Sequence, residues 1–141
     1  MARCMRLRLL LVLLAAAAPA FGACPAKFDD FLDRFESDRR FHLSSVRYPL
    51  RMTYLDDGPE DVPVKHATRL SRREYSMPRQ PWYPSPELQE DWKLAKTVRD
   101  VSKTRKVVRL EQLEVDGYRA EFHFQKVGAC WRLILLDDQS F

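Results

Sequence analysis

A stripe of apolar side chains near residue 30 constrains the fold more than any other feature of this sequence. Phe28, Phe31, Leu32 and Phe35 recur at intervals of three and four residues, and acidic residues with Arg34 fill the positions between them. That spacing places the four apolar side chains on one face of an α-helix. The sequence therefore predicts an amphipathic helix whose aromatic face packs into a core, in preference to the alternative that the stripe forms the wall of a ligand site.

The segment after this helix predicts a short helix and then two strands. Residues 39–45 are expected to form a second helical turn that ends by Pro49. Apolar and polar side chains alternate over residues 50–54, which is typical of a half-buried strand. A turn at residues 56–59 leads to a possible strand over residues 60–70, where a proline favours a sheet edge or a later start.

A proline-rich segment in the middle of the chain predicts an irregular, stiff loop. Four prolines lie within residues 77–86, around Trp82 and Tyr83, and proline removes amide donors and fixes φ. Ser85 followed by Pro86 is typical of a helix N-terminus. The buried stripe of the helix that follows is expected to comprise Leu88, Trp92 and Ala95.

The C-terminal third predicts an antiparallel meander. Residues 106–114 form one expected strand, Asp116-Gly117 a hairpin turn, and residues 118–125 a second strand with alternating polar and apolar faces. Residues 130–136 are almost continuously apolar. That last strand is therefore expected to be central in the sheet and covered on both faces.

The first 23 residues predict an export signal. Three arginines and no acid precede an apolar run from Leu9 to Ala18, which is shorter than the roughly 20 residues that span a bilayer. We expect a signal peptide at residues 1–23 and a single α+β domain at residues 24–141. The leader holds three of the 24 basic residues and none of the 20 acidic ones, so its removal lowers the net charge from +4 to +1. A nearly neutral chain gives no reason to expect a nucleic-acid partner.

Cys24 has two alternative fates. Residues 21–24 resemble a lipobox, although Phe21 stands where leucine is usual, and the cysteine of that motif takes a diacylglycerol and becomes the N-terminus. We therefore expect lipid attachment at Cys24 and a membrane-anchored protein facing the periplasm, the alternative being a soluble periplasmic or secreted protein. If Cys24 keeps its thiol in an oxidising compartment, it can pair with Cys130. The two fates exclude each other.

Both ends of the chain resemble one known protein family. The residues that carry the resemblance are the Trp131 strand and the segment Phe28-x-x-Phe31-Leu32-x-x-Phe35-x-x-Asp38-x-x-Phe41-His42-Leu43-Ser44-x-Val46-x-Tyr48-Pro49-Leu50. They resemble an uncharacterised family of bacterial envelope lipoproteins with the nuclear-transport-factor-two-like fold. The resemblance implies an α+β, cystatin-like cone, in which N-terminal helices pack on a curved, mostly antiparallel sheet and a pocket opens at one end. It implies no reaction, cofactor or catalytic residue, and it does not extend to residues 59–103.

The sequence contains no motif that assigns a reaction. It lacks a phosphate-binding glycine loop, a nucleophile elbow and metal-spaced cysteines, so no cofactor, metal site or catalytic residue is expected. Glu121 and His123 share one strand face and would form an acid–base pair if that face lined the cone, but an outward-facing surface is the preferred interpretation. His42 and His66 are interpreted as surface or capping groups, although His42 could face a pocket.

These observations favour an exported cell-envelope protein that is not an enzyme. We expect it to bind a small ligand in the cone, or a protein partner through the loop at Trp82 and Tyr83. One alternative is a small isomerase-like or dehydratase-like enzyme that uses Glu121 and His123, and another is a partner-neutralising protein of the immunity or inhibitor type. The basic runs over residues 69–79 and 93–109 are interpreted as solvated faces with local ion pairs, or as weak attraction to an anionic surface.

Overall fold

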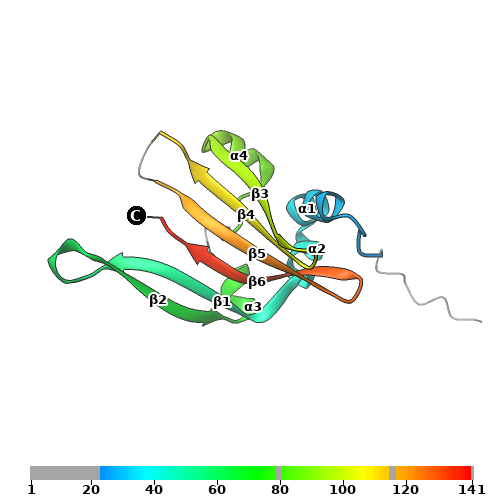
Figure 1. The fold of residues 1–141 in the computed structure, drawn as a ribbon, viewed down its shortest axis with the longest axis horizontal. Helices are drawn as coiled ribbons and strands as arrows, with labels where there is room; N and C mark the ends of the chain where they lie inside the picture. The colour runs from blue at the N-terminus through cyan, green and yellow to red at the C-terminus, as the bar shows by residue number, and fades with distance from the viewer. Residues whose placement is uncertain (1–22, 79–80, 115–116, 141) are drawn as a thin grey trace, which may run out of the picture.

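A six-stranded sheet organises the residues that the computed structural model describes, which are 23–78, 81–114 and 117–140 (Figure 1). The strand order is β2-β1-β6-β5-β4-β3, and every neighbouring pair is antiparallel except β1 with β6. The sheet is therefore mostly antiparallel, as the sequence predicts. The strands are β1 (Val46–Asp57), β2 (Pro63–Leu70), β3 (Leu94–Ser102), β4 (Arg105–Gln112), β5 (Arg119–Val127) and β6 (Cys130–Asp138).

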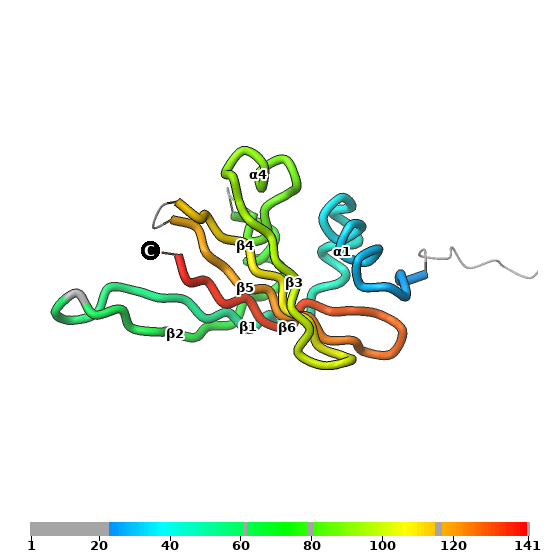
Figure 2. Tube along the Cα trace, turned by 45° about the horizontal axis from the view of Figure 1, so that its top comes forward, coloured from blue at the N-terminus to red at the C-terminus, as the bar shows by residue number. Residues whose placement is uncertain are grey.

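The helices lie together on one face of this sheet, as the views in Figures 1 and 2 show. They are α1 (Phe28–Ser37), α2 (Arg39–Ser44), α3 (Arg72–Ser76) and α4 (Pro86–Asp91), with a short 3₁₀ turn η1 (Pro59–Asp61) between β1 and β2. No helix in the described part of the chain is long and apolar enough to cross a membrane. The predicted export signal lies outside the described residues, apart from its last position.

The predicted aromatic stripe is confirmed as the centre of the core. Phe28, Phe31, Leu32 and Phe35 are all buried on α1. The ring centroids of Phe31 and Phe35 lie 5.8 and 5.3 Å from that of Phe124 on β5, in edge-to-face geometry. Aromatic pairs at such distances add to the stability that burial alone provides. The helix is thereby fixed against the middle of the sheet.

The predicted alternation in β5 is also confirmed. Ala120, Phe122 and Phe124 are buried beneath the helices, while Glu121 and His123 point to the opposite side, which we call the outer face. The strand β6 lies between β1 and β5, so its predicted central position is correct. Coverage on both faces is only partial, because the side chains of β6 on the outer face, such as Arg132 and Leu135, are half-buried.

The segment around α4 differs from the expectation. The helix ends at Asp91, and Gln89 is its buried residue in place of the expected apolar stripe. Lys93 adopts a positive φ of 52°, which reverses the chain into β3. Ala95 consequently lies in a strand that the sequence did not indicate, because side chains of β3 beyond residue 95 are exposed and show no apolar period.

Three predicted boundaries near prolines and turns have mixed outcomes. The sequence predicts that α2 ends by Pro49. It ends earlier, at Ser44, because β1 begins at Val46, and β1 then continues through Pro49. β2 begins at Pro63 and forms one edge of the sheet, which satisfies both alternatives for this strand. β4 and β5 pair as expected, while Asp116 of the predicted hairpin turn lies outside the described residues.

Candidate functional site

The loop around Trp82 is anchored to α1 through a buried carboxylate. Tyr83 is only 3% exposed, and its hydroxyl donates to Oε1 of Glu36 at 2.6 Å. The Glu36 side chain, itself 5% exposed, also accepts from Lys96 Nζ at 2.9 Å and from Gln89 Nε2 at 3.2 Å. Three donors thus satisfy this charge, as a buried carboxylate requires. Tyr83, one of the two loop aromatics considered for binding on sequence grounds, is therefore mainly a core residue.

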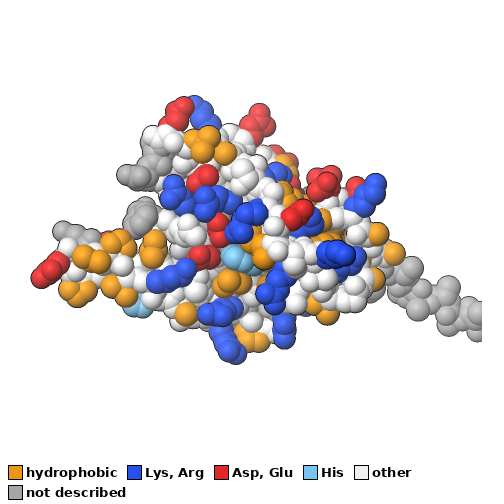
Figure 3. All heavy atoms as spheres, in the orientation of Figure 1, with side chains coloured by type: hydrophobic (Ala, Val, Ile, Leu, Met, Phe, Trp, Pro, Cys, Tyr) orange, Lys and Arg blue, Asp and Glu red, His pale blue; other side chains and the backbone are white. Residues whose placement is uncertain are grey.

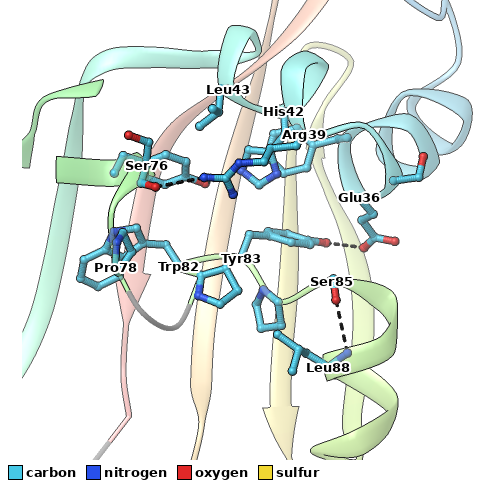
Figure 4. A pocket seen from close by; sticks show the side chains of 15 residues that line it. Glu36, Arg39, His42, Leu43, Ser76, Pro78, Trp82, Tyr83, Ser85 and Leu88 are labelled. Atoms are coloured by element: carbon cyan, nitrogen blue, oxygen red, sulfur yellow. Dashed lines mark hydrogen bonds between the residues drawn. The ribbon is translucent and has the colours of Figure 1, made fainter. Parts of the chain in front are cut away.

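A cleft lies between this loop and the first three helices (Figure 4). We call it the loop cleft; its volume is ≈ 360 Å³. The Arg39 side chain crosses it and donates from Nη2 to the carbonyl oxygen of Ser76 at 3.0 Å. The residues that line it are Phe35, Glu36, Ser37, Arg39, His42, Leu43, Tyr75, Ser76, Pro78, Pro81, Trp82, Tyr83, Pro84, Ser85 and Leu88.

His42 lines the loop cleft, so its interpretation as a surface or capping group is wrong. Its ring stacks on Phe35 with centroids 3.9 Å apart, and its Nε2 lies 2.7 Å from the Tyr75 hydroxyl. Burial lowers the pKa of His42 to about 4, a hydrogen bond to the Phe35 backbone opposes that shift, and the Arg39 charge adds to it. His42 is consequently neutral at physiological pH. The exposed position expected for His66 is confirmed.

A second cavity opens on the other side of Trp82, against the concave face of the sheet. We call it the aromatic pocket; its volume is ≈ 580 Å³. Trp82 and Pro81 of the loop, Trp92 after α4 and Tyr118 before β5 form its walls, and strand residues form its floor. The full lining is Pro78, Pro81, Trp82, Trp92, Tyr118, Ala120, Leu136, Asp138 and Ser140.

Hydrogen bonds connect the three segments that carry the rings of the aromatic pocket. Gln112 donates from Nε2 to the carbonyl oxygen of Trp92 at 3.0 Å, and its Oε1 accepts from the backbone amide of Tyr118 at 3.1 Å. The Tyr118 hydroxyl donates to the carbonyl oxygen of Trp82 at 3.3 Å. The Trp82 Nε1 atom is buried and has no hydrogen-bond partner. These contacts set the shape of the aromatic pocket before any ligand enters.

Glu121 and His123 lie together on the outer face, away from both cavities. His123 Nε2 is 3.5 Å from Glu121 Oε2, and Arg109 binds the other Glu121 oxygen through Nη2 at 2.8 Å and Nε at 3.0 Å. Burial lowers the pKa of His123, against the opposing charge of Glu121. The preferred interpretation of this pair as outward-facing is confirmed. On the face of the molecule that Figure 3 draws, Lys and Arg side chains are numerous, with acids interspersed.

Several members of the predicted basic runs form local ion pairs, as expected. Lys96 binds Glu36 across the concave side, and Lys106 pairs with Asp100 on the neighbouring strand. Outside these runs, Lys65 Nζ lies 2.9 Å from Oδ1 of the buried Asp137 on the outer face. Arg79 of the first run lies outside the described residues.

Cys24 is joined to Cys130 by a disulfide, with the two Cα atoms 5.3 Å apart. This bond ties the segment before α1 to the first residue of β6. It is the second of the two fates considered for Cys24, and a sulfur in a disulfide cannot also carry a diacylglycerol. Lipid attachment at Cys24 therefore stays a prediction for a state of the chain without this bond.

The sequence indicated some of the residues that form the aromatic pocket and missed others. Trp82 was a candidate binding residue, and Tyr118 lies two positions before Ala120, on the same strand face. Trp92 was assigned to a helix interior, and no local pattern marked Asp138 as part of a site. Only the fold brings the loop, the end of α4 and the end of β6 together.

Comparisons with known proteins agree with this architecture. No model of a protein family matches the sequence, and no curated protein matches it. An NTF2-like protein from Bacteroides fragilis NCTC 9343 superposes with a TM-score of 0.56 and 21% identity, over 81% of this chain and 47% of that chain. This chain thus spans about half the length of that structure.

Two further solved structures superpose less well. An NTF2-like protein of unknown function from Shewanella baltica OS155 gives a TM-score of 0.38 and 14% identity, over 73% of this chain and 77% of that chain. A protein of unknown function with a cystatin-like fold from Nostoc punctiforme PCC 73102 gives 0.38 and 11%, over 84% of this chain and 94% of that chain. The superposition on the Bacteroides structure identifies the fold of this chain as NTF2-like, a fold that often forms ligand-binding pockets.

Proposed function

We propose that this chain is an exported binding protein that holds a small molecule in its aromatic pocket and performs no reaction on it. The observation that carries the proposal is the construction of this pocket. Three aromatic side chains from separate segments surround a cavity of ≈ 580 Å³. Cavities of this size that are lined mainly by apolar and aromatic groups, with few polar ones, are typical of small-molecule sites.

The ionisation of Tyr118 supports binding in preference to acid–base chemistry. Burial, followed by the nearby charge of Asp138, raises the pKa of the Tyr118 hydroxyl above its usual range. A phenol that stays protonated at neutral pH serves as a hydrogen-bond donor and not as a general base. Among the described residues that line the aromatic pocket, none is a histidine, lysine or arginine.

The geometry gives less support to the two alternatives. An enzyme that uses Glu121 and His123 would need these groups inside the cone, and both lie on the outer face. Protein-partner binding through a flat aromatic surface would need both loop aromatics exposed, and Tyr83 is buried. A small ligand needs neither arrangement, because it would occupy the aromatic pocket, which the fold leaves accessible.

Two observations support export. The leader over residues 1–23 has the charge and length of a signal peptide, and Cys24 and Cys130 form a disulfide. Disulfides persist in oxidising compartments such as the periplasm. The disulfide favours a soluble exported form over a lipid-anchored one, because both modifications need the same sulfur.

The function is tested by mapping ligands on the protein with NMR. A library of small fragments is screened against the disulfide-bonded chain with labelled methyl groups. We expect binders to shift the methyl signals of Ala120 and Leu136, which form the floor of the aromatic pocket. The Trp92→Ala variant should lose these shifts, whereas Leu113→Ala, at a residue that is 75% exposed, should retain them.

Other patterns would contradict the proposal. Shifts confined to Leu43 would place the ligand in the loop cleft instead. Shifts confined to the methyl groups of Leu135, which is paired with His123, with turnover of any fragment that depends on His123, would favour the enzyme alternative. A library that leaves Ala120 and Leu136 unperturbed throughout would exclude the aromatic pocket as a binding site.

A further inference from the structure

The aromatic pocket differs in charge from the rest of the molecule. Its described lining contains one ionisable acid, Asp138, and no basic side chain. The loop cleft, by contrast, contains Arg39. A hollow on the outer face contains Arg51 and Lys65. A pocket whose described lining has a carboxylate and no basic side chain, in a chain with 24 basic residues, is suited to a ligand of positive charge.

The two adjacent aspartates at the end of β6 point to opposite faces of the sheet and have different hydrogen-bond and ion-pair partners. Asp137 points to the outer face, where Lys65 lies 2.9 Å away and where Thr53 and Gln139 also donate to it. Asp138 points to the concave side, and its Oδ1 accepts only the backbone amide of Ser140, at 3.0 Å. Within the described ranges no lysine, arginine or histidine pairs with Asp138. Among the described residues, its carboxylate is therefore not neutralised by a basic side chain.

The rings around Asp138 favour a particular kind of cation. The centroids of Trp92 and Tyr118 lie 5.7 Å apart with an interplanar angle of 51°, so the two rings form a corner and not a stack. Trp82 closes a third side. Aromatic faces attract cations through the ring quadrupole, and groups of such faces recognise quaternary ammonium ions, which have no N–H to donate. A primary ammonium would need three acceptors, and Asp138 is the one carboxylate among the described lining residues.

We propose that the aromatic pocket binds a small organic cation through a quaternary ammonium group, with Trp82, Trp92 and Tyr118 around the methyl groups and Asp138 as the counter-charge. This inference rests on the proposed function, because it names the ligand class of the same pocket. The raised pKa of Tyr118, to which the Asp138 charge contributes, agrees with a negative field at the rings.

The test compares choline with its neutral carbon isostere, dimethylbutanol. The two probes have the same shape and differ in one charge, and binding is followed by tryptophan fluorescence and by the Ala120 and Leu136 methyl signals. We expect choline to bind at least about tenfold more tightly than dimethylbutanol. Asp138→Asn should remove most of that preference. Glu90→Gln removes an exposed acid of α4 and should leave it unchanged.

Each outcome separates the ligand class from the function. Equal affinity for both probes at Ala120 and Leu136 would overturn the cation inference while the binding function stands. If neither probe shifts these signals but other fragments do, the inference also fails and the function stands. If nothing shifts them, both fail.

Because Trp92→Ala could impair folding, Trp92→Phe gives a second variant, for which we expect weaker choline binding. Glycerophosphocholine as a third probe distinguishes the source, since tighter binding than choline would indicate a lipid headgroup.

Discussion

Burial determines the charge of His42, and this has a consequence for stability. The ring is held between the Phe35 ring and the Tyr75 hydroxyl. The hydrogen bond to the Phe35 backbone raises the pKa, so the ring acts as the donor in it. The remaining Nε2 lone pair therefore accepts from Tyr75, in the neutral tautomer. Protonation would break this arrangement and leave a cation in an apolar site.

Acidification should consequently destabilise the protein through His42. Its pKa is about 4 in the folded chain, below the ordinary 6.5, so the unfolded chain binds the proton more tightly. Stability from this group is complete above pH 6.5 and declines as the pH falls from there toward 4. We expect the unfolding free energy to drop by about 2 kcal/mol between pH 7 and pH 5, measured by urea denaturation.

Two variants identify the histidine responsible. His42→Gln should remove most of this pH dependence. His123→Gln should retain most of it, although the lowered pKa of His123 acts in the same direction. A His42→Gln variant with an unchanged pH profile would show that His42 is not the group that titrates.

Among the elements, α1 contributes most to the core, through rings that contact the sheet directly. Phe31 is fully buried and its centroid lies 5.5 Å from that of Phe41 on α2 and 5.8 Å from that of Phe124 on β5. It therefore links both N-terminal helices to the middle of the sheet. Removal of its ring would leave a cavity that neighbouring rigid rings cannot fill.

The cost of that cavity can be measured. Phe31→Ala should lower the free energy of unfolding by about 3–5 kcal/mol, the range typical of a fully buried phenylalanine. Val98→Ala, at a residue that is 44% exposed, should change it by less than about 0.5 kcal/mol. A loss near zero for Phe31→Ala in chemical denaturation would contradict the packing of α1 described above.

The elements also show what a sequence can predict. Phe28 to Phe35 and Ala120 to Phe124 were predictable because each obeys one period, 3.6 or 2, against a single core. The strand β3 was not, because it lies at a sheet edge and most of its side chains face solvent. Gln89 is buried because Glu36 and the Pro84 carbonyl accept from its amide, which is a long-range effect. For the same reason, Trp92 and Asp138 could not be assigned to one pocket beforehand.

For the whole molecule, the disulfide connects the start of the described chain to the start of β6. Cys24 and Cys130 are separated by 106 residues, so their bond restricts nearly the entire unfolded chain. A cross-link over a loop of this length contributes about 4–5 kcal/mol in the chain-entropy model. It is therefore expected to be a principal source of stability for a domain of this size.

Reduction should reveal this contribution. The reduced chain, or Cys130→Ser, should lose up to about 4–5 kcal/mol of unfolding free energy, measured by denaturation with and without reductant.

Mass spectrometry of the exported protein decides the fate of Cys24. A disulfide lowers the mass by two hydrogen atoms, whereas an added diacylglycerol at Cys24 would show that the lipid-anchored form prevails and that Cys130 is a free thiol.

The strand β6 also sets the two ends of the molecule apart. It starts at the disulfide and ends at Asp138, eight residues later, which corresponds to roughly 26 Å of extended chain. Figure 1 shows the N-terminal and C-terminal segments leaving at opposite ends of the sheet. A chain immobilised on a sensor chip or bead through the residues next to Cys24 would thus keep Asp138, which lines the aromatic pocket, at the end of β6 remote from the point of attachment.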